Sequence, residues 1–264
     1  MLPAVNVFIT GASSGLGEAL AYRYAKTGAT LGLFARRRDR LRSLQESLTT
    51  TASSPIHIYE GDVADVQTLQ RAAQHFLASV GVPDIVIANA GVSHGTITGG
   101  EGDSDLPVFR EVFDTNVMGI VHTFHPFIDA MRDAKHGTLV GVASVAGFRG
   151  LPGSSAYSAS KAAAISYLES LRVDLRGSGI AVVTLCPGFI ATPMTANNPY
   201  PMPFLISASE AADLMVRAIA QKKRRYTFPW PMMLVGKLLR VLPDAAYDVL
   251  FAHAPHKPRK SQPG

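Results

Sequence analysis

The sequence is poor in cysteine and contains no long uninterrupted apolar segment. Its 264 residues include a single cysteine, Cys186, so the chain cannot form an internal disulfide. The first residues lead directly into the strand-like run AVNVFIT, without the charged region and long apolar stretch of a secretion signal. We therefore expect no leader segment and a cytoplasmic location.

Charge of either sign is also modest, and the formal net charge is +5. The basic excess lies in residues 36–42, in residues 222–225 and at the end of the chain, without interleaved aromatic residues. Such local clusters do not predict a surface for nucleic acid, and we expect no such partner. We assign no metal site. A hydrophobic content of 47% is sufficient for the core of one domain.

Three glycines define the first motif. Residues 4–10 read as a short strand, and Gly11, Gly15 and Gly17 separate it from a helical pattern that reaches Lys26. Glycines here permit a tight turn, close approach of the backbone to a pyrophosphate and close packing of helix on strand. The phosphates then lie at the amino end of the helix. We assign cofactor contacts to Gly11, Ser13, Ser14, Gly15, Leu16 and Gly17.

An acidic residue is missing after the second predicted strand, Thr30–Ala35. In dinucleotide-binding folds a carboxylate at this point binds the adenosine ribose hydroxyls. Arg36 follows the strand instead, and its guanidinium suits a 2′-phosphate because it can bind that group bidentately. The sequence therefore favours NADP(H) over NAD(H). Arg37 and Arg38 are interpreted as solvated charges at the start of the next helix, residues 39–48.

Predicted strands and helices continue to alternate along the chain. Strand 56–59 is followed by Asp62, which is placed to accept a hydrogen bond from an adenine amino group. Strand 83–88 leads into the Asn-Ala-Gly turn 89–91, whose small residues let the backbone approach the cofactor. This alternation predicts an α/β fold with a doubly wound parallel sheet of the Rossmann type.

A serine, a tyrosine and a lysine carry the predicted chemistry. Tyr157 and Lys161 are four residues apart, so on a helix their side chains lie on one face. The ammonium is expected to lower the pKa of the phenol from its usual value of about 10, so that it exchanges protons near neutral pH. Ser144 ends the apolar strand 138–143, on the side of the sheet where ligands bind.

Asn116 and His94 each admit two interpretations. Asn116 lies inside a long helical pattern, residues 106–134, although asparagine favours helices poorly. It is either tolerated near a kink at Gly119 or it has a functional role. His94 lies in the glycine-rich loop 93–105 and is interpreted as an exposed loop histidine, with contact to substrate as the alternative.

Residues 4–228 resemble the short-chain dehydrogenase/reductase family. The motifs that carry the resemblance are TGASSGLG at 10–17, Asp62-Val63, Asn89-Ala90-Gly91, Asn116, Ser144, YSASK at 157–161 and PGFIATPM at 187–194. One departure is Ala88, where many members have asparagine before the Asn-Ala-Gly turn.

The resemblance implies the strand order 3-2-1-4-5-6-7. It implies that Tyr157 is the acid–base residue, that Ser144 polarises the carbonyl, and that Lys161 holds the nicotinamide ribose and lowers the pKa of Tyr157. Asn116 would support a water-mediated proton path to Lys161. Cofactor contacts are also implied for Val63 and for Pro187, Gly188, Ile190 and Thr192, with Ile190 and Thr192 at the carboxamide. A homo-oligomer, either a dimer or a tetramer, is expected.

We therefore predict an NADP(H)-dependent oxidoreductase that interconverts a carbonyl and a secondary alcohol by hydride transfer, on an apolar or lipid-like small molecule. The alternative is a non-catalytic protein of the same fold that senses a dinucleotide. Residues 1–228 form the catalytic domain and residues 229–264 an amphipathic tail. Its helix, residues 232–242, is too short to cross a bilayer. It would cover the pocket, contact another subunit or lie on a membrane surface, helped by basic residues at 256–260.

Overall fold

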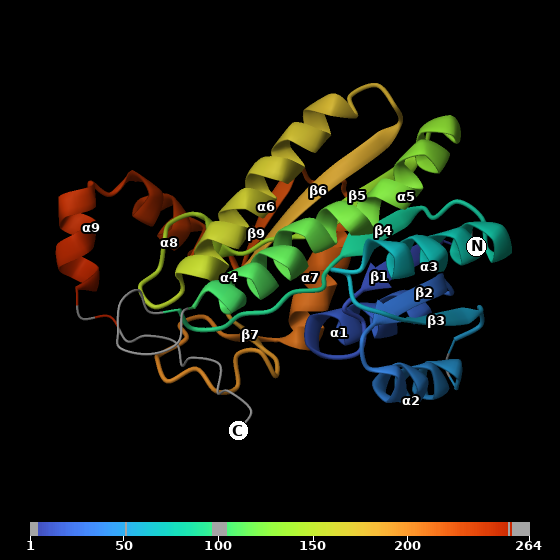
Figure 1. Ribbon diagram of the computed structural model, residues 1–264, viewed down its shortest axis with the longest axis horizontal. Coiled ribbons are helices and arrows are strands. Elements are labelled where there is room, and N and C mark those ends of the chain that lie inside the picture. Colours follow the sequence, from blue (N-terminus) through green and yellow to red (C-terminus); the bar gives the residue numbers. More distant parts are fainter. Residues whose placement is uncertain (1–4, 51, 97–104, 253, 255–264) are drawn as a thin grey trace.

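The computed structural model describes residues 5–50, 52–96, 105–252 and 254. They form a seven-stranded parallel sheet in the order β3-β2-β1-β4-β5-β6-β9, with helices on both faces (Figure 1). The predicted doubly wound topology is confirmed. The seventh strand is β9 because a separate parallel pair, β7 (Ile190–Ala191) and β8 (Ile206–Ser207), precedes it in the chain. The strands of the large sheet are β1 Asn6–Thr10, β2 Thr30–Ala35, β3 Ile56–Glu60, β4 Ile85–Ala88, β5 Gly137–Val142, β6 Ile180–Pro187 and β9 Arg225–Phe228.

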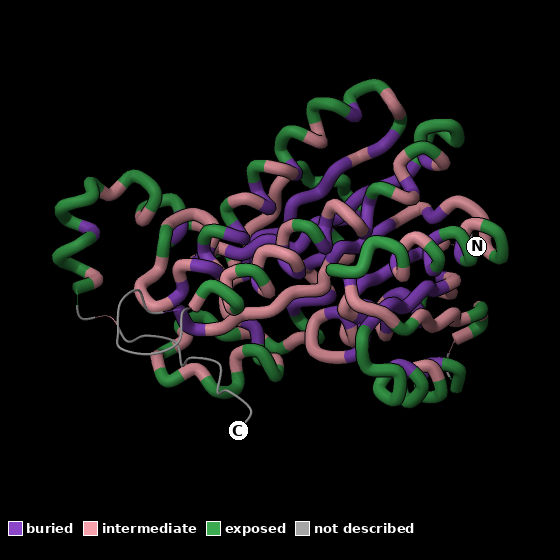
Figure 2. Tube along the Cα trace, viewed as in Figure 1, coloured by how far each residue is buried: buried purple, intermediate pink, exposed green. Residues whose placement is uncertain are grey.

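Alternate side chains of the strands enter two separate cores. In β1, Val7 and Ile9 pack in the core shared with α1, α2 and α7, whereas Phe8 packs in the core shared with α3, α5 and α6. This alternation follows from the two-residue period of a strand. Buried residues accordingly run through the middle of the molecule, and exposed residues cover the outer helices (Figure 2). The helices are α1 Gly15–Ala25, α2 Arg38–Thr49, α3 Val66–Ser79, α4 Leu106–Phe113, α5 Gly119–Asp133, α6 Ser155–Asp174, α7 Ala208–Ala220, α8 Trp230–Val241 and α9 Asp244–Phe251.

The long helix expected at residues 106–134 is interrupted. A π-helical segment, Asp114–Met118, joins α4 to α5 and contains Asn116. Glycine at position 119 allows the helix to pack closely against Val63. A Cβ added to Gly119 would lie 2.7 Å from Cγ2 of Val63. Short π segments often mark functional positions in helices.

The C-terminal tail forms two helices rather than one. α8 begins at Trp230, two residues before the predicted start, and α9 was not predicted. Pro243 lies between them, where its ring ends the helical hydrogen-bond pattern. The basic residues at 256–260 lie outside the described part of the chain.

Candidate active site

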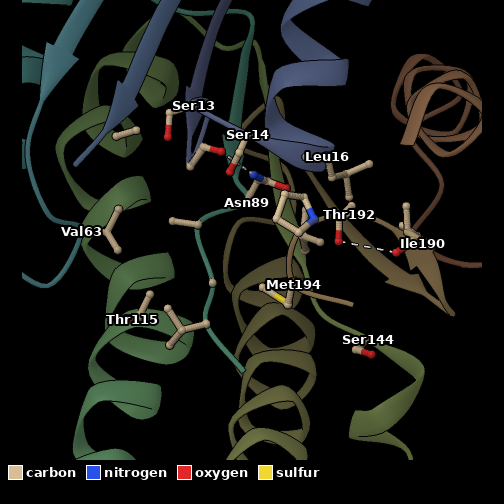
Figure 3. A pocket seen from close by; sticks show the side chains of 18 of the residues that line it. Ser13, Ser14, Leu16, Val63, Asn89, Thr115, Ser144, Ile190, Thr192 and Met194 are labelled. Atoms are coloured by element: carbon tan, nitrogen blue, oxygen red, sulfur yellow. Dashed lines mark hydrogen bonds between the residues drawn. The ribbon is translucent and has the colours of Figure 1, made fainter. Parts of the chain in front are cut away.

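A pocket of about 360 Å³ opens at the carboxyl ends of the strands. Loops that follow β1, β2, β3, β4, β5 and β6 all line it, as expected for an open parallel sheet. Figure 3 shows side chains from these separate loops around one space. Every predicted site residue lines the pocket except Gly17 and Asn116.

The glycine-rich turn is shaped by close backbone contacts. Gly11 has a φ of +68°, and a Cβ added there would lie 2.7 Å from Cα of Ala90. A Cβ on Gly17 would collide with the carbonyl oxygen of Gly11, so this glycine packs α1 against the turn instead of facing the pocket. The side-chain amide of Asn89 donates to the carbonyl oxygens of Thr10 and Gly11, at 3.1 and 3.3 Å. Gly17 therefore has a packing role, and its contact with a cofactor remains a prediction.

Two arginines line the pocket just after β2. Nη1 of Arg36 is 3.6 Å from Oδ2 of Asp62, and both side chains remain substantially exposed. Nη2 of Arg37 donates to Oγ of Ser14 at 2.6 Å and to Oγ of Ser13 at 3.3 Å. Arg37 is exposed at the start of α2, as interpreted, but it also contacts the glycine-rich turn. Because β1 and β2 are adjacent and parallel, the residues just beyond their carboxyl ends face each other.

Asn116 is fully buried and holds neighbouring elements together. Its Oδ1 accepts from the backbone N–H of Val92 at 2.8 Å, and its Nδ2 donates to the Val92 carbonyl at 2.9 Å. Nδ2 also donates to Oγ of Ser160 at 3.0 Å, in the helix turn between Tyr157 and Lys161. The side chain thus joins the loop after β4 to α6. The water-mediated path to Lys161 remains a prediction.

Ser144, Tyr157 and Lys161 meet where β5 and α6 approach each other. Ser144 caps a short 3₁₀ turn, Val145–Gly147, by accepting from the N–H of Ala146 at 3.1 Å. Tyr157 and Lys161 lie one turn apart in α6, and Nζ of Lys161 is 5.8 Å from the centre of the Tyr157 ring. Lys161 is buried, and its Nζ donates to the carbonyl of Val142 at 2.8 Å.

Burial controls the protonation of this group. The pKa of Tyr157 is raised because burial disfavours the phenolate; a hydrogen bond with Ser144 acts in the opposite direction and the nearby phenol of Tyr200 in the same one. The pKa of Lys161 is lowered from 10.5 to about 8, again by burial. The expected lowering of the Tyr157 pKa is therefore not found, since the cost of burying the phenolate is the largest effect on this group.

The loop after β6 lies against the glycine-rich turn. A Cβ added to Gly15 would lie 3.3 Å from the side chain of Thr192. Oγ1 of Thr195 donates to the carbonyl of Ile190 at 2.6 Å, and the N–H of Thr192 donates to that same Oγ1 at 3.1 Å. Thr192 Oγ1 makes a longer contact with the Ile190 carbonyl, drawn in Figure 3. These bonds fix the wall of the pocket opposite α1.

A family model described as short chain dehydrogenase matches residues 5–201. The chain belongs to this family. An uncharacterized oxidoreductase of Myxococcus xanthus is 39% identical over 92% of this chain and 94% of its own length. A protein of Arabidopsis thaliana named 11-beta-hydroxysteroid dehydrogenase-like 4A is 34% identical over 90% of this chain and 81% of its own length.

Solved structures of short-chain dehydrogenases share the fold. A family member from Burkholderia phymatum in complex with NAD is 25% identical, has a TM-score of 0.81 and covers 98% of both chains. An alcohol dehydrogenase of Thermococcus sibiricus complexed with 5-hydroxy-NADP is also 25% identical, with a TM-score of 0.76 over 85% of this chain and 96% of its own. One of these structural neighbours is therefore complexed with NAD and the other with an NADP derivative.

For this short-chain dehydrogenase, sequence reasoning missed part of the pocket. The additional lining residues are Phe34, Ala35, Arg37, Gly61, Val92, Thr115, Val142, Ala143, Pro193, Met194 and Thr195. Most are immediate neighbours of predicted residues and could have been found by extending each motif. Thr115 directly precedes the predicted Asn116 in the π segment, but it is Thr115 and not Asn116 that lines the pocket.

His94 is partly buried rather than exposed. Its Nε2 lies 3.7 Å from Oε1 of Glu111 in α4. Within the described ranges, no group of three histidine, cysteine, aspartate or glutamate residues could hold a metal ion. The helices described here include none that is long and apolar enough to cross a membrane.

Proposed function

We propose that this short-chain dehydrogenase interconverts a carbonyl and a secondary alcohol with NADP(H), on an apolar small molecule. The observation that carries the proposal is the meeting of Ser144, Tyr157 and Lys161 in the same pocket as the glycine-rich turn. The turn supplies the place for a dinucleotide, because Gly11 and Gly15 have positive φ and line the pocket with their backbone at the amino end of α1. When bound, the cofactor supplies the hydride.

Tyr157 serves as the proton donor for carbonyl reduction. Its raised pKa keeps the phenol protonated at neutral pH, so a proton is available as negative charge develops on the carbonyl oxygen. The hydroxyl of Ser144 supplies a second hydrogen bond to that oxygen. In alcohol oxidation the same two groups act in reverse.

Lys161 stabilises the phenolate that remains after proton transfer. With a pKa of about 8, Lys161 is protonated in most molecules at pH 7. The buried ammonium is close enough to Tyr157 to act on its charge, and it can donate to ribose hydroxyls of the bound cofactor. Asn116 is a positioning residue in this proposal, since it holds Ser160 and Val92 on either side.

The choice of NADP(H) is supported by the adenosine end of the pocket. Ala35 ends β2 without a carboxylate, and Arg36 and Arg37 both line the space where a 2′-phosphate would lie. Arginine binds phosphate strongly through paired N–H groups.

An apolar substrate is supported by the residues near the catalytic group. Met194 lines the pocket, Phe189 and Tyr200 have ring centres 6.4 Å apart, and Phe204 and Leu205 are exposed on the same loop. The name of the Arabidopsis relative points to a steroid, which is a bulky apolar alcohol of this class.

The test follows NADPH absorbance with a panel of steroid, cyclic and long-chain ketones. Tyr157→Phe should lose at least about a hundredfold in turnover, the size typical of a lost acid–base group, while NADPH binding is retained. Tyr167→Phe in the same helix is the matched control and should turn over normally. Retention of more than a tenth of the activity by Tyr157→Phe would contradict its role. NADPH binding without turnover of any ketone or alcohol would favour the non-catalytic alternative.

A further inference from the structure

α8 presents an apolar stripe to solvent. Trp230, Leu234, Leu238 and Val241 follow each other at spacings of four, four and three residues, which places them on one helical face. Between 53% and 76% of each side chain is exposed. We call these four residues the α8 stripe. A contiguous exposed apolar surface of this kind marks an interaction site in a folded protein.

The stripe is held in a fixed place by the other side of the helix. Met232 and Gly236 are buried. A Cβ on Gly236 would collide with the ring of Phe148, and one on Gly188 would lie 2.6 Å from Cγ of Met232. α8 therefore packs on the loops that follow Ser144 and Pro187, beside the pocket.

A single arginine adds a polar attachment. Nη1 of Arg149 donates to the carbonyls of Leu239 and Leu242, at 3.2 and 2.9 Å, where the end of α8 leaves carbonyls without helical partners. Nη2 of Arg149 is 2.7 Å from Oδ1 of Asp244, and the guanidinium lies over the ring of Tyr247 in α9. These contacts attach both tail helices to the rest of the protein, and they fix the orientation of the α8 stripe.

Positive charge borders the stripe. Lys237 and Arg240 lie beside it on the helix, both are exposed, and α8 contains no acidic residue. At about 100° per residue, Lys237 falls next to Trp230 and Arg240 falls further around on the same side. α9, which follows at the same end of the molecule (Figure 1), exposes two further apolar side chains, Val249 and Leu250.

We propose that the α8 stripe docks on an anionic lipid surface, with Lys237 and Arg240 at the phosphate headgroups. A helix with tryptophan and leucine on one side and lysine and arginine at its border lies in the plane of a membrane interface. The charged ends of lysine and arginine reach water while their stems cover apolar surface. Tryptophan suits the same depth because its ring is apolar and its N–H is polar. A two-fold contact with a second copy of the chain fits less well, because it would bring the positive borders of two α8 helices together and α8 has no acidic residue to pair with them.

The docked orientation brings the pocket close to the lipid. α8 touches Phe148, four residues after Ser144, and Met232 touches Gly188 of the pocket wall. An apolar substrate dissolved in the membrane would then have a short way to the site. Lipid binding itself does not depend on the proposed reaction, and it can be measured without substrate.

The fluorescence of Trp230 can report lipid binding. Trp230 is the only tryptophan in the sequence and belongs to the stripe. Full-length protein is titrated with vesicles of phosphatidylglycerol and phosphatidylcholine, and separately with phosphatidylcholine vesicles. We expect a blue shift of Trp230 emission with the anionic vesicles and quenching by brominated acyl chains. Salt at 1 M should weaken the binding at least severalfold by screening Lys237 and Arg240.

Leu234→Glu/Leu238→Glu should weaken vesicle binding more than tenfold. Val173→Glu is the matched control, because Val173 is an equally exposed apolar residue in α6, outside the tail, and its loss should leave vesicle binding unchanged. Circular dichroism and NADPH binding verify folding of each variant. If the double variant does not fold, Lys237→Glu/Arg240→Glu changes only exposed side chains and should also weaken binding more than tenfold.

Three outcomes would overturn the proposal. One is the absence of any Trp230 shift with anionic vesicles at low salt. Another is equal loss of binding in Val173→Glu. The third is a blue shift that grows with protein concentration without lipid and disappears in the double variant, which would assign the stripe to a second copy of the chain.

Discussion

Replacing Lys161 by methionine should stabilise the protein at neutral pH while removing its activity. Burial lowers the pKa of Lys161 from 10.5 to about 8, so the folded state holds this ammonium less readily than the unfolded chain does. At about 1.4 kcal/mol per pH unit, the charged lysine costs roughly 3 kcal/mol of folding free energy at pH 7. Loss of the hydrogen bond from Lys161 to the Val142 carbonyl destabilises the variant by about 1 kcal/mol. The variant should therefore gain about 2 kcal/mol at pH 7.

The sign of the pH dependence distinguishes this cause from better packing. Between pH 8 and 10.5 the unfolded chain binds more protons at Lys161 than the folded chain, so the stability of the parent protein from this group rises with pH. Below pH 8 the charged Lys161 destabilises the folded state by nearly the full amount. The advantage of Lys161→Met should therefore shrink by about 2 kcal/mol between pH 7 and pH 9.5.

Urea unfolding of both proteins at the two pH values, at one ionic strength, measures this change. Lys237→Met serves as the control, because it removes an exposed lysine from α8 and reports the general effect of losing one positive charge. An advantage of Lys161→Met that is equal at pH 7 and pH 9.5, or larger at pH 9.5, would refute the reasoning.

Two further changes test Arg36 in the pocket and the buried Asn116 beside it. Arg36→Ala should weaken NADP(H) binding by roughly ten- to a hundredfold, the equivalent of about 1.5–3 kcal/mol for a charge-assisted contact, and leave NAD(H) nearly unchanged. Fluorescence titration with both cofactors measures this, with Arg38→Ala as control, and equal losses for the two would contradict the assignment. Asn116→Ala should lower the free energy of unfolding by about 2–4 kcal/mol, because both backbone groups of Val92 lose their partner. Urea unfolding against the exposed Asn197→Ala measures it; a loss no greater than in the control would mean that water replaces the amide.

Much of the fold was predictable because each local pattern agreed with the next. The apolar runs in the strands, the glycine-rich turn and the polar residues after each strand all require one edge of a parallel sheet. Tyr157 and Lys161 are near each other by helical geometry alone, and Ser144 was placed at that edge by the end of its strand.

The remaining features depend on tertiary contacts. The contact of Arg37 with Ser14 depends on where a long side chain points after β2, which spacing along the chain does not determine. The direction of the Tyr157 pKa shift is set mainly by burial of the phenol, which the spacing of Tyr157 and Lys161 does not reveal. α9 was missed because its eight residues are too few to show a clear helical period, and its place is fixed by Arg149 and Tyr247.

The π segment Asp114–Met118 makes the site depend on chain length as well as on side chains. A π turn contains one residue more than the α-helix that would replace it, so the faces of α4 and α5 are offset by about 100°. Deleting one residue here would let α4 and α5 join in a regular helix with better hydrogen-bond geometry. Asn116 and Thr115 would then rotate relative to α6 and the pocket. We therefore expect such a deletion to improve the helix and to damage the site, although it would remove no side chain that lines the pocket if Thr115 is kept.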